Sequence, residues 1–522
     1  MSPIPSRPGT GTGHRNDESS HDHLPATEQT PLLLGGGSVP KNGTESPVVV
    51  SAPDSSASSS RDDDEGKEDE DVDRPLPRLQ IFLLCYARMM DPVAFFSIFP
   101  YIAEMVHRVG DVPDTDVGFY SGLIESLFSI SQMLVLVGWG RLSDRIGRKP
   151  VLLYSFVGLV VSPLLFGMST SPWQMIAFRC LAGIFSGSGL IIRTMLSELS
   201  TPQTQAQAFS WFAFGSNIGI FVGPLIGGAL ADPVRQYPGV FGESRFFRKY
   251  PYALSGFAVA ALASTAFVTS ALFLEETLDD DKKSSKKSRS KAKSNLSIWE
   301  IIKSPGVAIV LWVYNHAMVL AFSYTAVIPV ALYTPVALGG LGFGPSSISI
   351  VMAIQGASQA IWLILVFPFL QHRVGTKGIM RGCAIGYPFF FASFVVLSTL
   401  LRNGSQPAMV LFWILGGITN VIGPGVAMCF TGAQLALNDV APDHHVLGTL
   451  NAIALTVSSG VRSVIPGMAS AVFAVGVKHQ IFRGHLEWLT LIPLSLAYFA
   501  CVRHLPEGKR PHRPTGNERE AA

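Results

Sequence analysis

Four ionisable side chains lie inside long apolar stretches of this 522-residue chain: Asp91, Glu125, Arg179 and Arg462. A charge at the centre of a bilayer costs about 2.5 kcal/mol or more unless it meets water or a partner, so such residues usually face the protein interior. Counted at about 1.5 Å per helical residue, Asp91, Glu125 and Arg179 reach a comparable depth, and Arg462 lies only slightly further along. The spacing therefore predicts a polar chamber near the middle of a membrane.

Carboxyl groups that share such a chamber with guanidinium groups could carry protons. The proton affinity of a carboxyl group there depends on how wet its surroundings are and on whether a cation is near. We expect Asp91 or Glu125 to exchange a proton while Arg179 pairs alternately with it, with Arg462 adding a charge from the second half of the chain. The alternative is a static buried salt bridge that holds three helices together.

The elements that must position these residues are helices that cross a membrane. The chain has 48% hydrophobic and only 15% charged residues, with a mean hydropathy of +0.35, which indicates a polytopic membrane protein. Twelve segments approach or exceed the roughly 20 apolar residues that span a bilayer core. They lie at about 79–106, 118–139, 151–169, 172–196, 206–231, 252–274, 307–333, 346–370, 378–401, 407–435, 446–475 and 486–504.

The segments form two sets of six, and the polar stretches around them set the expected domains. We expect an acidic, disordered tail (1–75), a first six-helix bundle (76–275), a basic linker (276–297), a second bundle (298–504) and a final tail (505–522). Basic residues favour the cytosolic side, which places both tails and the linker there. The loop between segments 5 and 6, with Arg235, Arg245, Arg248 and Lys249, does not fit this rule.

A charged turn between segments 2 and 3 carries a family resemblance. Its pattern G-x-x-x-D-R-x-G-R-K resembles the loop between helices 2 and 3 of the major facilitator superfamily, and the matching residues are Gly140, Asp144, Arg145, Gly147, Arg148 and Lys149. The resemblance implies an all-α membrane protein with twelve transmembrane helices in two pseudo-symmetric six-helix bundles around a central cavity. It also implies that Asp144 and Arg145 act with the turn as part of a gate.

Segment 5 contains a second motif, formed by Gly219, Gly223, Pro224, Gly227 and Gly228. It resembles the antiporter motif of the drug:proton branch of this superfamily, and glycines one turn apart let a neighbouring helix approach closely. The alternative is simple helix packing. Arg179, with a glycine four residues later, resembles the superfamily's R-x-x-x-G motif. Asp91, which is followed by a proline, resembles the plant and fungal branch of the superfamily, including the zinc-induced facilitators.

Polar side chains elsewhere in the apolar segments are candidates for the substrate cavity: Asn217, Asn315, His316, Gln355, Gln359 and Asn420. Each one alone fits a contact between helices at least as well as a ligand contact. His316 could titrate near neutral pH or could form a hydrogen bond with Gln355, and the sequence favours neither.

The leading hypothesis is a proton-coupled antiporter that exports or sequesters a drug-like compound or a metal chelate. The alternatives are a uniporter or symporter that imports a nutrient, and a nutrient receptor built on a transporter scaffold. No enzyme motif, metal-ligand spacing, cofactor site or basic stripe for nucleic acid is found, so we expect a lipid-embedded monomer. A dileucine signal at Glu28, Leu32 and Leu33 favours adaptor binding and a vacuolar or endosomal membrane over the plasma membrane.

Overall fold

The computed structural model describes residues 77–201, 204–278, 298–440 and 444–506. The predicted tail 1–75 with its dileucine signal, residues 279–297 of the predicted linker and nearly all of the final tail lie outside these ranges. All the described residues belong to one compact unit, 63–522.

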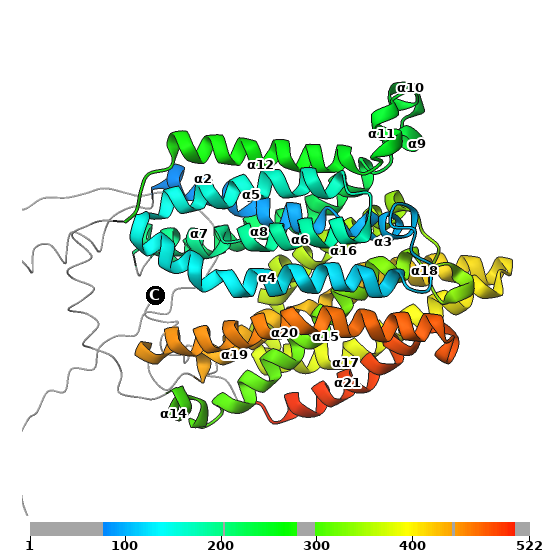
Figure 1. Cartoon of the computed structure of the whole chain (residues 1–522). Coiled ribbons are helices and arrows are strands. Elements are labelled where there is room, and N and C mark those ends of the chain that lie inside the picture. Colours follow the sequence, from blue (N-terminus) through cyan, green and yellow to red (C-terminus); the bar gives the residue numbers. More distant parts are fainter. Residues whose placement is uncertain (1–76, 202–203, 279–297, 441–443, 507–522) are drawn as a thin grey trace, which may run out of the picture. The chain divides into compact units, whose positions relative to one another are not determined.

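Six membrane crossings make up the first half of the described chain (Figure 1). Their helices are α2 (Arg78–Phe96) continued by α3 (Phe99–Arg108), α4 (Val117–Ile146), α5 (Arg148–Gly167), α6 (Pro172–Phe185) continued by α7 (Ser188–Leu199), α8 (Gln205–Ala229) and α12 (Ala253–Phe273). The break between α2 and α3 comes where Pro100 lacks the N–H that would continue the helix. Three short helices project beyond α8 and α12: α9 (Pro233–Gln236), α10 (Pro238–Phe241) and α11 (Arg245–Lys249).

The second half begins with a short helix, α14 (Ile298–Lys303), and repeats the same plan. Its helices are α15 (Val307–Tyr333), α16 (Pro345–Ile361), a π-helical turn (Trp362–Val366), α17 (Phe367–Asn403), α18 (Gln406–Ile422), a 3-10 turn (Gly423–Ala427), α19 (Met428–Asp439), α20 (His444–Lys478) and α21 (Leu486–Arg503). Short 3-10 turns at Val336–Leu338 and Ile481–Gly484 complete the connections.

The described residues contain eleven helical runs long and apolar enough to cross a membrane. One of them, Pro345–Asn403, is 59 residues long and is interrupted at Gly375, where φ is 70° and ψ is 170°. Because this run folds into two crossings, all twelve predicted segments are present, and the prediction of an all-helical membrane fold is confirmed.

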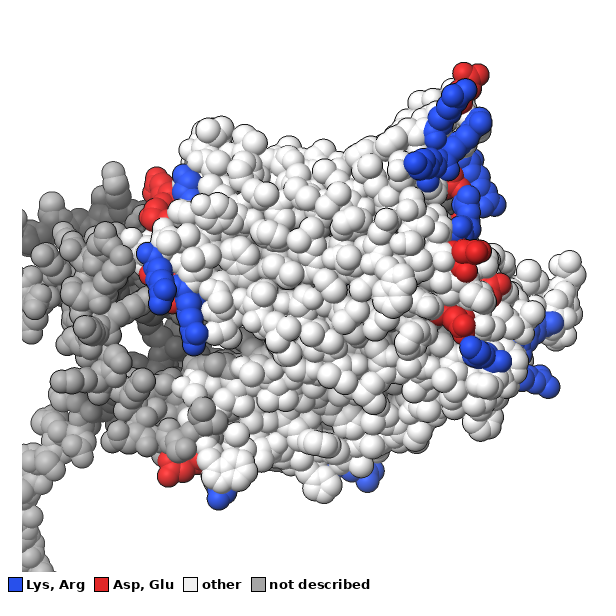
Figure 2. Space-filling model, viewed as in Figure 1, with Lys and Arg blue, Asp and Glu red and all other residues white. Residues whose placement is uncertain are grey.

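Charged side chains gather mainly at the two ends of the helices and leave an uncharged band between them on the face shown in Figure 2. The beginning of α2, the end of α21 and the turn between α4 and α5 lie at one end (Figure 1). We call this end the turn face and the other end the opposite face. The uncharged band is what a bilayer core requires, because lipid tails cannot solvate ions.

Helices α2 and α8 pack backbone against backbone over about three turns. A Cβ atom placed on any of four successive glycines of α8 would meet a carbonyl oxygen of α2 or of the residue that follows it: Gly215 at Cys85, Gly219 at Met89, Gly223 at Val93 and Gly227 at Ser97. The four-residue repeat on both helices keeps the contact on one stripe of each. Only glycine allows this approach.

The two halves meet through α4 and α20, and through α8 and α16. The contacts between α4 and α20 follow the two helices antiparallel to each other: Gly118 with Phe473, Gly122 with Ser470, Ser126 with Gly467, and Met133 with Ser463. Next along the two helices, Leu136 of α4 and Ser459 of α20 line one small cavity. The Ser349 hydroxyl of α16 donates to the Pro224 carbonyl of α8 at 2.7 Å. The halves are therefore in contact through two pairs of helices.

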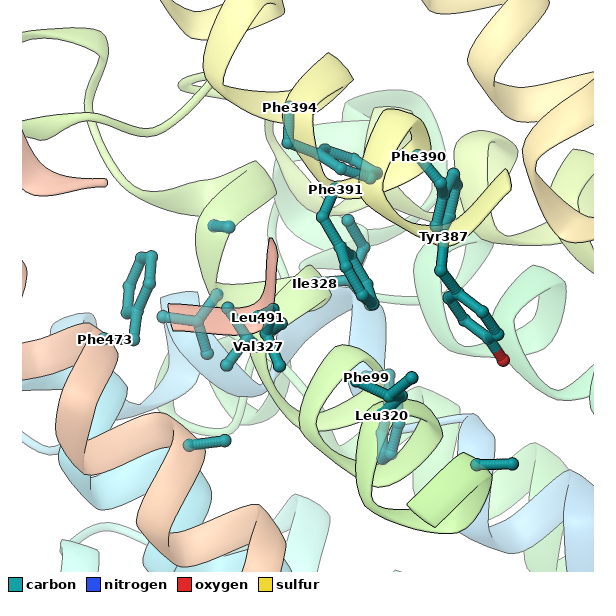
Figure 3. Close-up of a cluster of buried hydrophobic side chains, with 14 of the residues drawn as sticks. Phe99, Leu320, Val327, Ile328, Tyr387, Phe390, Phe391, Phe394, Phe473 and Leu491 are labelled. Carbon is teal, nitrogen blue, oxygen red and sulfur yellow. The ribbon is translucent and has the colours of Figure 1, made fainter. Parts of the chain in front are cut away.

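Aromatic and aliphatic side chains fill the interior between these helices (Figure 3). One continuous buried cluster includes Phe99 of the first half together with Leu320 and Phe391 of the second. Phe394 stacks on Trp488 with ring centroids 4.6 Å apart. Because residues of both halves belong to one cluster, the halves are held together by apolar packing as well as by polar contacts.

The packing of α2 on α8 predicts that the glycine stripe does not tolerate side chains. Replacing Gly219 by Leu forces the side chain into the Met89 carbonyl and the Pro92 ring, because its Cβ atom would lie only 2.5 and 2.9 Å from them. We expect a loss of roughly 1–3 kcal/mol or more, seen as a lower melting temperature of the full chain in detergent. Gly417→Leu on α18 is the control, because a Cβ there meets nothing within 4 Å. Equal melting temperatures for the two variants would contradict this packing.

Candidate functional site

The Asp91 carboxylate is fully engaged by its neighbours. The Arg88 guanidinium, three residues earlier on α2, lies 3.0 Å from one carboxylate oxygen. The Ser188 hydroxyl at the start of α7 lies 2.5 and 2.6 Å from the two oxygens. Arg88 also donates to the Ser216 hydroxyl of α8 at 2.8 Å. Asp91 and Arg88 thereby join three helices of the first half at one point.

Ser188 is held in place by the break between α6 and α7. A helix break leaves backbone N–H groups without partners. The Ser155 hydroxyl of α5 accepts from the N–H groups of Gly187 and Ser188 at 3.2 and 3.0 Å and donates to the Phe185 carbonyl at 2.5 Å. The Ser155 hydroxyl thus provides hydrogen-bond partners for the backbone groups at the break and fixes Ser188, which binds Asp91.

Glu125 and Arg179 are buried, with exposed fractions of 7% and 4%. The Arg179 guanidinium lies over the rings of Phe128 and Phe95, 4.3 and 4.9 Å from their centroids, and one of its nitrogens donates to the Phe95 carbonyl at 3.5 Å. Its Nε atom has no hydrogen-bond partner among the described residues. Glu125 interacts electrostatically with Arg179 and Arg462, yet within the described ranges it forms no ion pair shorter than 4.0 Å.

Arg462 brings the second half of the chain to the same place. Its guanidinium lies 5.0 Å from the centroid of the Phe95 ring, which Arg179 also contacts. It interacts electrostatically with both Asp91 and Glu125. The four ionisable residues selected from the sequence therefore lie in one region of the structure.

Two small cavities border this region. One of about 40 Å³ is lined by Asp91, Phe95, Phe128 and Arg179 together with other residues of the first half. The other, also about 40 Å³, lies between the halves and is lined by Ser129, Gln132, Met133, Leu136, Ser459 and Arg462. Each has room for a few water molecules. Asp91 and Arg179 thus share one void, and Arg462 borders another.

The expected pairing of Arg179 with Asp91 is absent from this structure. Arg88 occupies that place instead, because it lies one turn from Asp91 on the same helix. Arg88 was not among the residues selected from the sequence, although its spacing of three residues from Asp91 would have identified it. Arg193 of α7 was also missed, and it contacts the same Phe212 ring as Arg88, at 5.2 and 4.9 Å.

The charged turn builds an ion network at the turn face. The buried Arg148 guanidinium pairs with Asp144 at 2.6 Å and with Glu198 of α7 at 3.2 Å, and it donates to the Ser143 hydroxyl at 2.9 Å. The Asp144 side chain is 65% exposed. Asp144 is thus bound to its own turn in this conformation. Arg145 is exposed and Lys149 is half-buried.

A carboxylate from the end of the first bundle completes this network. Glu276, three residues after α12, accepts from the backbone N–H groups of Arg148 and Lys149 at 2.8 and 3.1 Å. Negative charge is favourable at the N-terminus of a helix, where N–H groups lack partners. Gly147 has φ of 111°, and a Cβ on it would lie 2.5 Å from the Glu276 carboxylate. Glycine at this position therefore leaves room for the capping group. A Cβ atom placed on Gly140, in contrast, would contact only the Leu190 side chain of α7.

The candidate cavity residues of the second half are only partly brought together. The Tyr324 hydroxyl donates to Gln355, and the Gln355 amide donates to Asn420, at 3.0 and 2.9 Å. Of the two alternatives for His316, the hydrogen bond with Gln355 is not formed in this structure, since His316 contacts the Leu494 carbonyl of α21 at 3.0 Å.

The remaining candidates lie apart from this network. The Asn315 amide donates to the Leu311 carbonyl of its own helix at 2.8 Å. For Asn217 and Gln359 the described residues provide no side-chain hydrogen bond that would place them in a site. The sequence could not separate these residues, because a polar side chain inside a helix can bond its own backbone as readily as a ligand.

The sequence and the fold were compared with known proteins. The profile of the Major Facilitator Superfamily matches residues 80–466. The chain is 44% identical to the efflux pump azaK of Aspergillus niger over 82% of this chain and 88% of that protein. It is 27% identical to ZINC INDUCED FACILITATOR 1 of Arabidopsis thaliana over 77% of this chain and 85% of that protein. The D-xylose–proton symporter structure has a similar fold, with a TM-score of 0.63 at 12% identity, covering 83% of this chain and 99% of the symporter.

The cap on α5 predicts a specific role for Glu276 at the turn. Glu276→Ala removes the acceptor of two helix N–H groups, and we expect a loss of about 1 kcal/mol of stability, measured as a lower melting temperature of the full chain. Hydrogen exchange of the Arg148 and Lys149 amides should become faster in the same variant. Glu275→Ala is the matched control, because only the backbone N–H of Glu275 is engaged, by Gln80. Unchanged exchange in Glu276→Ala would contradict the cap.

Proposed function

Because this chain belongs to the Major Facilitator Superfamily, and is therefore a multi-pass membrane transporter and not an enzyme, we propose that it carries a small organic molecule by alternating access with coupling to protons at Glu125. The observation that supports this most directly is the position of that carboxylate. Glu125 is buried between Arg179 of its own half and Arg462 of the other half, without a close ion pair among the described residues.

Glu125 suits a proton carrier better than Asp91 does. A buried carboxylate is stable as an anion only where donors or cations compensate it. Asp91 has three such contacts, from Arg88 and Ser188. Glu125 has no contact of that kind with any described residue, so small movements of Arg179 or Arg462 decide whether its charged or its neutral form is favoured. Asp91 instead positions Arg88 next to α8.

The contacts between the halves support alternating access. α4 and α20 pack against each other from Gly118 to Met133, on the side of the opposite face. The Asp116 carboxylate before α4 pairs with Lys478 at the end of α20 at 3.0 Å, beyond the packed region. Opening toward the opposite face requires these contacts to break, while the turn network around Arg148 stays within the first half.

The sequence of α8 and the relative named an efflux pump support exchange of the substrate for protons, either for export or for sequestration in a vacuole. The plasma membrane is the alternative location. A sorting adaptor would bind the signal formed by Glu28, Leu32 and Leu33. Residues of both halves line the site, so one chain is sufficient to form it. Symport and uniport are the other coupling modes that a gradient experiment separates.

Transport into proteoliposomes under an imposed pH gradient tests the role of Glu125. A panel of organic anions, organic cations and zinc chelates supplies the first substrate. We expect gradient-driven accumulation by the natural sequence and its loss in Glu125→Gln, because the amide cannot release a proton. Exchange of labelled for unlabelled substrate without a gradient should persist in that variant. Glu243→Gln, in the exposed loop of the opposite face, is the control.

Three results would count against this proposal. Accumulation that ignores the pH gradient would indicate a uniporter, and full gradient-driven transport by Glu125→Gln would exclude this residue as the proton site. Asp91→Asn distinguishes the two carboxylates, since we expect it to lower exchange and gradient-driven transport together, as Arg88 and Ser188 lose their acceptor. Loss of gradient-driven transport alone in Asp91→Asn would move the proton site to Asp91.

A further inference from the structure

Guanidinium groups outnumber carboxylates around the site. Arg88, Arg179, Arg193 and Arg462 surround it with only Asp91 and Glu125 as acids. Asp91 forms an ion pair with Arg88. In the part of the chain that the structure describes, no carboxylate lies within 4.0 Å of the other three arginines. The region therefore carries positive charge that its own acids do not balance.

Two aromatic rings each receive two of these guanidinium groups. Arg88 and Arg193 lie 4.9 and 5.2 Å from the centroid of Phe212. The two cations are therefore within about 10 Å of each other, a distance over which charges still interact at moderate salt. Cation–π contact stabilises each guanidinium on the ring but does not remove the repulsion between the two cations.

The second ring repeats this arrangement across the two halves. Arg179 and Arg462 lie 4.9 and 5.0 Å from the centroid of Phe95. Both guanidinium groups interact electrostatically with the Glu125 carboxylate. When Glu125 is protonated, both guanidinium groups lose that partner.

Arg193 is accessible, whereas the ring beneath it is buried. Arg193 is exposed although it lies over Phe212, which is 5% exposed, and interacts with the buried Tyr314 of the second half. A guanidinium in this position has donor groups free for a ligand, and its planar fork fits a carboxylate or a sulfonate. The buried Phe212 ring thus holds this guanidinium in place and leaves its N–H groups to a ligand.

We propose that these guanidinium groups bind the negatively charged end of the transported molecule, so that the substrate is an organic anion. Arg193 and Arg462 are the contacts from the two halves, and the rings of Phe212 and Phe95 hold them in place. This inference rests on the proposed function, because it takes the site between the halves as the place where the transported molecule binds.

Three probes that differ only in charge test this inference: naphthalene-2-carboxylate, naphthalene-2-carboxamide and 2-naphthylmethylammonium. Binding to the full chain in nanodiscs is measured by calorimetry at neutral pH without a gradient. We expect the carboxylate to bind about tenfold or more tightly than either of the other two, as charge-assisted hydrogen bonds provide. Arg193→Gln and Arg462→Gln should each remove most of that preference.

Two further variants separate charge from folding. Arg193→Lys and Arg462→Lys keep the positive charge and should retain a preference for the carboxylate. Arg373→Gln is the matched control, because Arg373 also lies over a phenylalanine ring, Phe369 at 4.4 Å, but lies in the first part of α17, before the interruption at Gly375. Its preference should equal that of the natural sequence.

Several outcomes would overturn the inference: equal or tighter binding of the amide or the ammonium probe, binding of none of the three, or a preference that survives in the Arg193→Gln, Arg462→Gln double variant. Displacement of the carboxylate by chloride at an equal concentration would identify a site for an inorganic counter-ion only. Binding is measured without a gradient, whereas the role of Glu125 is tested by gradient-driven transport, so the two proposals can fail separately.

Discussion

A charged group inside a membrane is stable only beside an opposite charge, water or the face of an aromatic ring, and this constraint determines how the site of this transporter is built. The carboxylates do not balance all of the positive charge here, and two phenylalanine rings, Phe95 and Phe212, stabilise part of the rest. Each ring contacts two arginine guanidinium groups. At Phe95 this keeps cations from both halves close together without a close ion pair among the described residues, whereas Arg88 at Phe212 is paired with Asp91. The cations at Phe95 are thus available to a proton-carrying acid and to a ligand.

That arrangement depends on how closely the helices approach. The glycine stripe of α8 brings its backbone against the carbonyl groups of α2. This contact places Ser216 of α8 within hydrogen-bond reach of Arg88 and sets Phe212 under the same guanidinium. Larger residues on α8 would move Arg88 away from both. The motif that resembles an antiporter signature thus has a direct structural consequence, since it fixes one wall of the charged site.

The sequence predicts the framework better than the partners within it. Periodic apolar runs are a strong signal, and all twelve crossings are found, whereas partner choice depends on distances across helices that sequence spacing does not report. Arg88 was within reach of a local argument, because it lies one turn from Asp91. Glu276 was not, since its contact with the start of α5 joins residues 128 positions apart. His316 shows the same limit, because its partner is a backbone carbonyl of α21 that carries no sequence signature.

The charge balance of the site links the substrate to the mode of coupling. A bound anion and the Glu125 carboxylate compete for the same guanidinium groups, so protonation of Glu125 favours the anion, and the anion favours protonation in return. Proton and substrate would then occupy the site together and cross in the same direction, so an anionic substrate favours symport over the exchange that the motif of α8 suggests. A cationic substrate would give exchange, since it binds best while Glu125 is charged. The sign of the substrate's charge and the direction of proton movement are therefore one physical question, because both are set by whether Glu125 or the ligand balances Arg179 and Arg462.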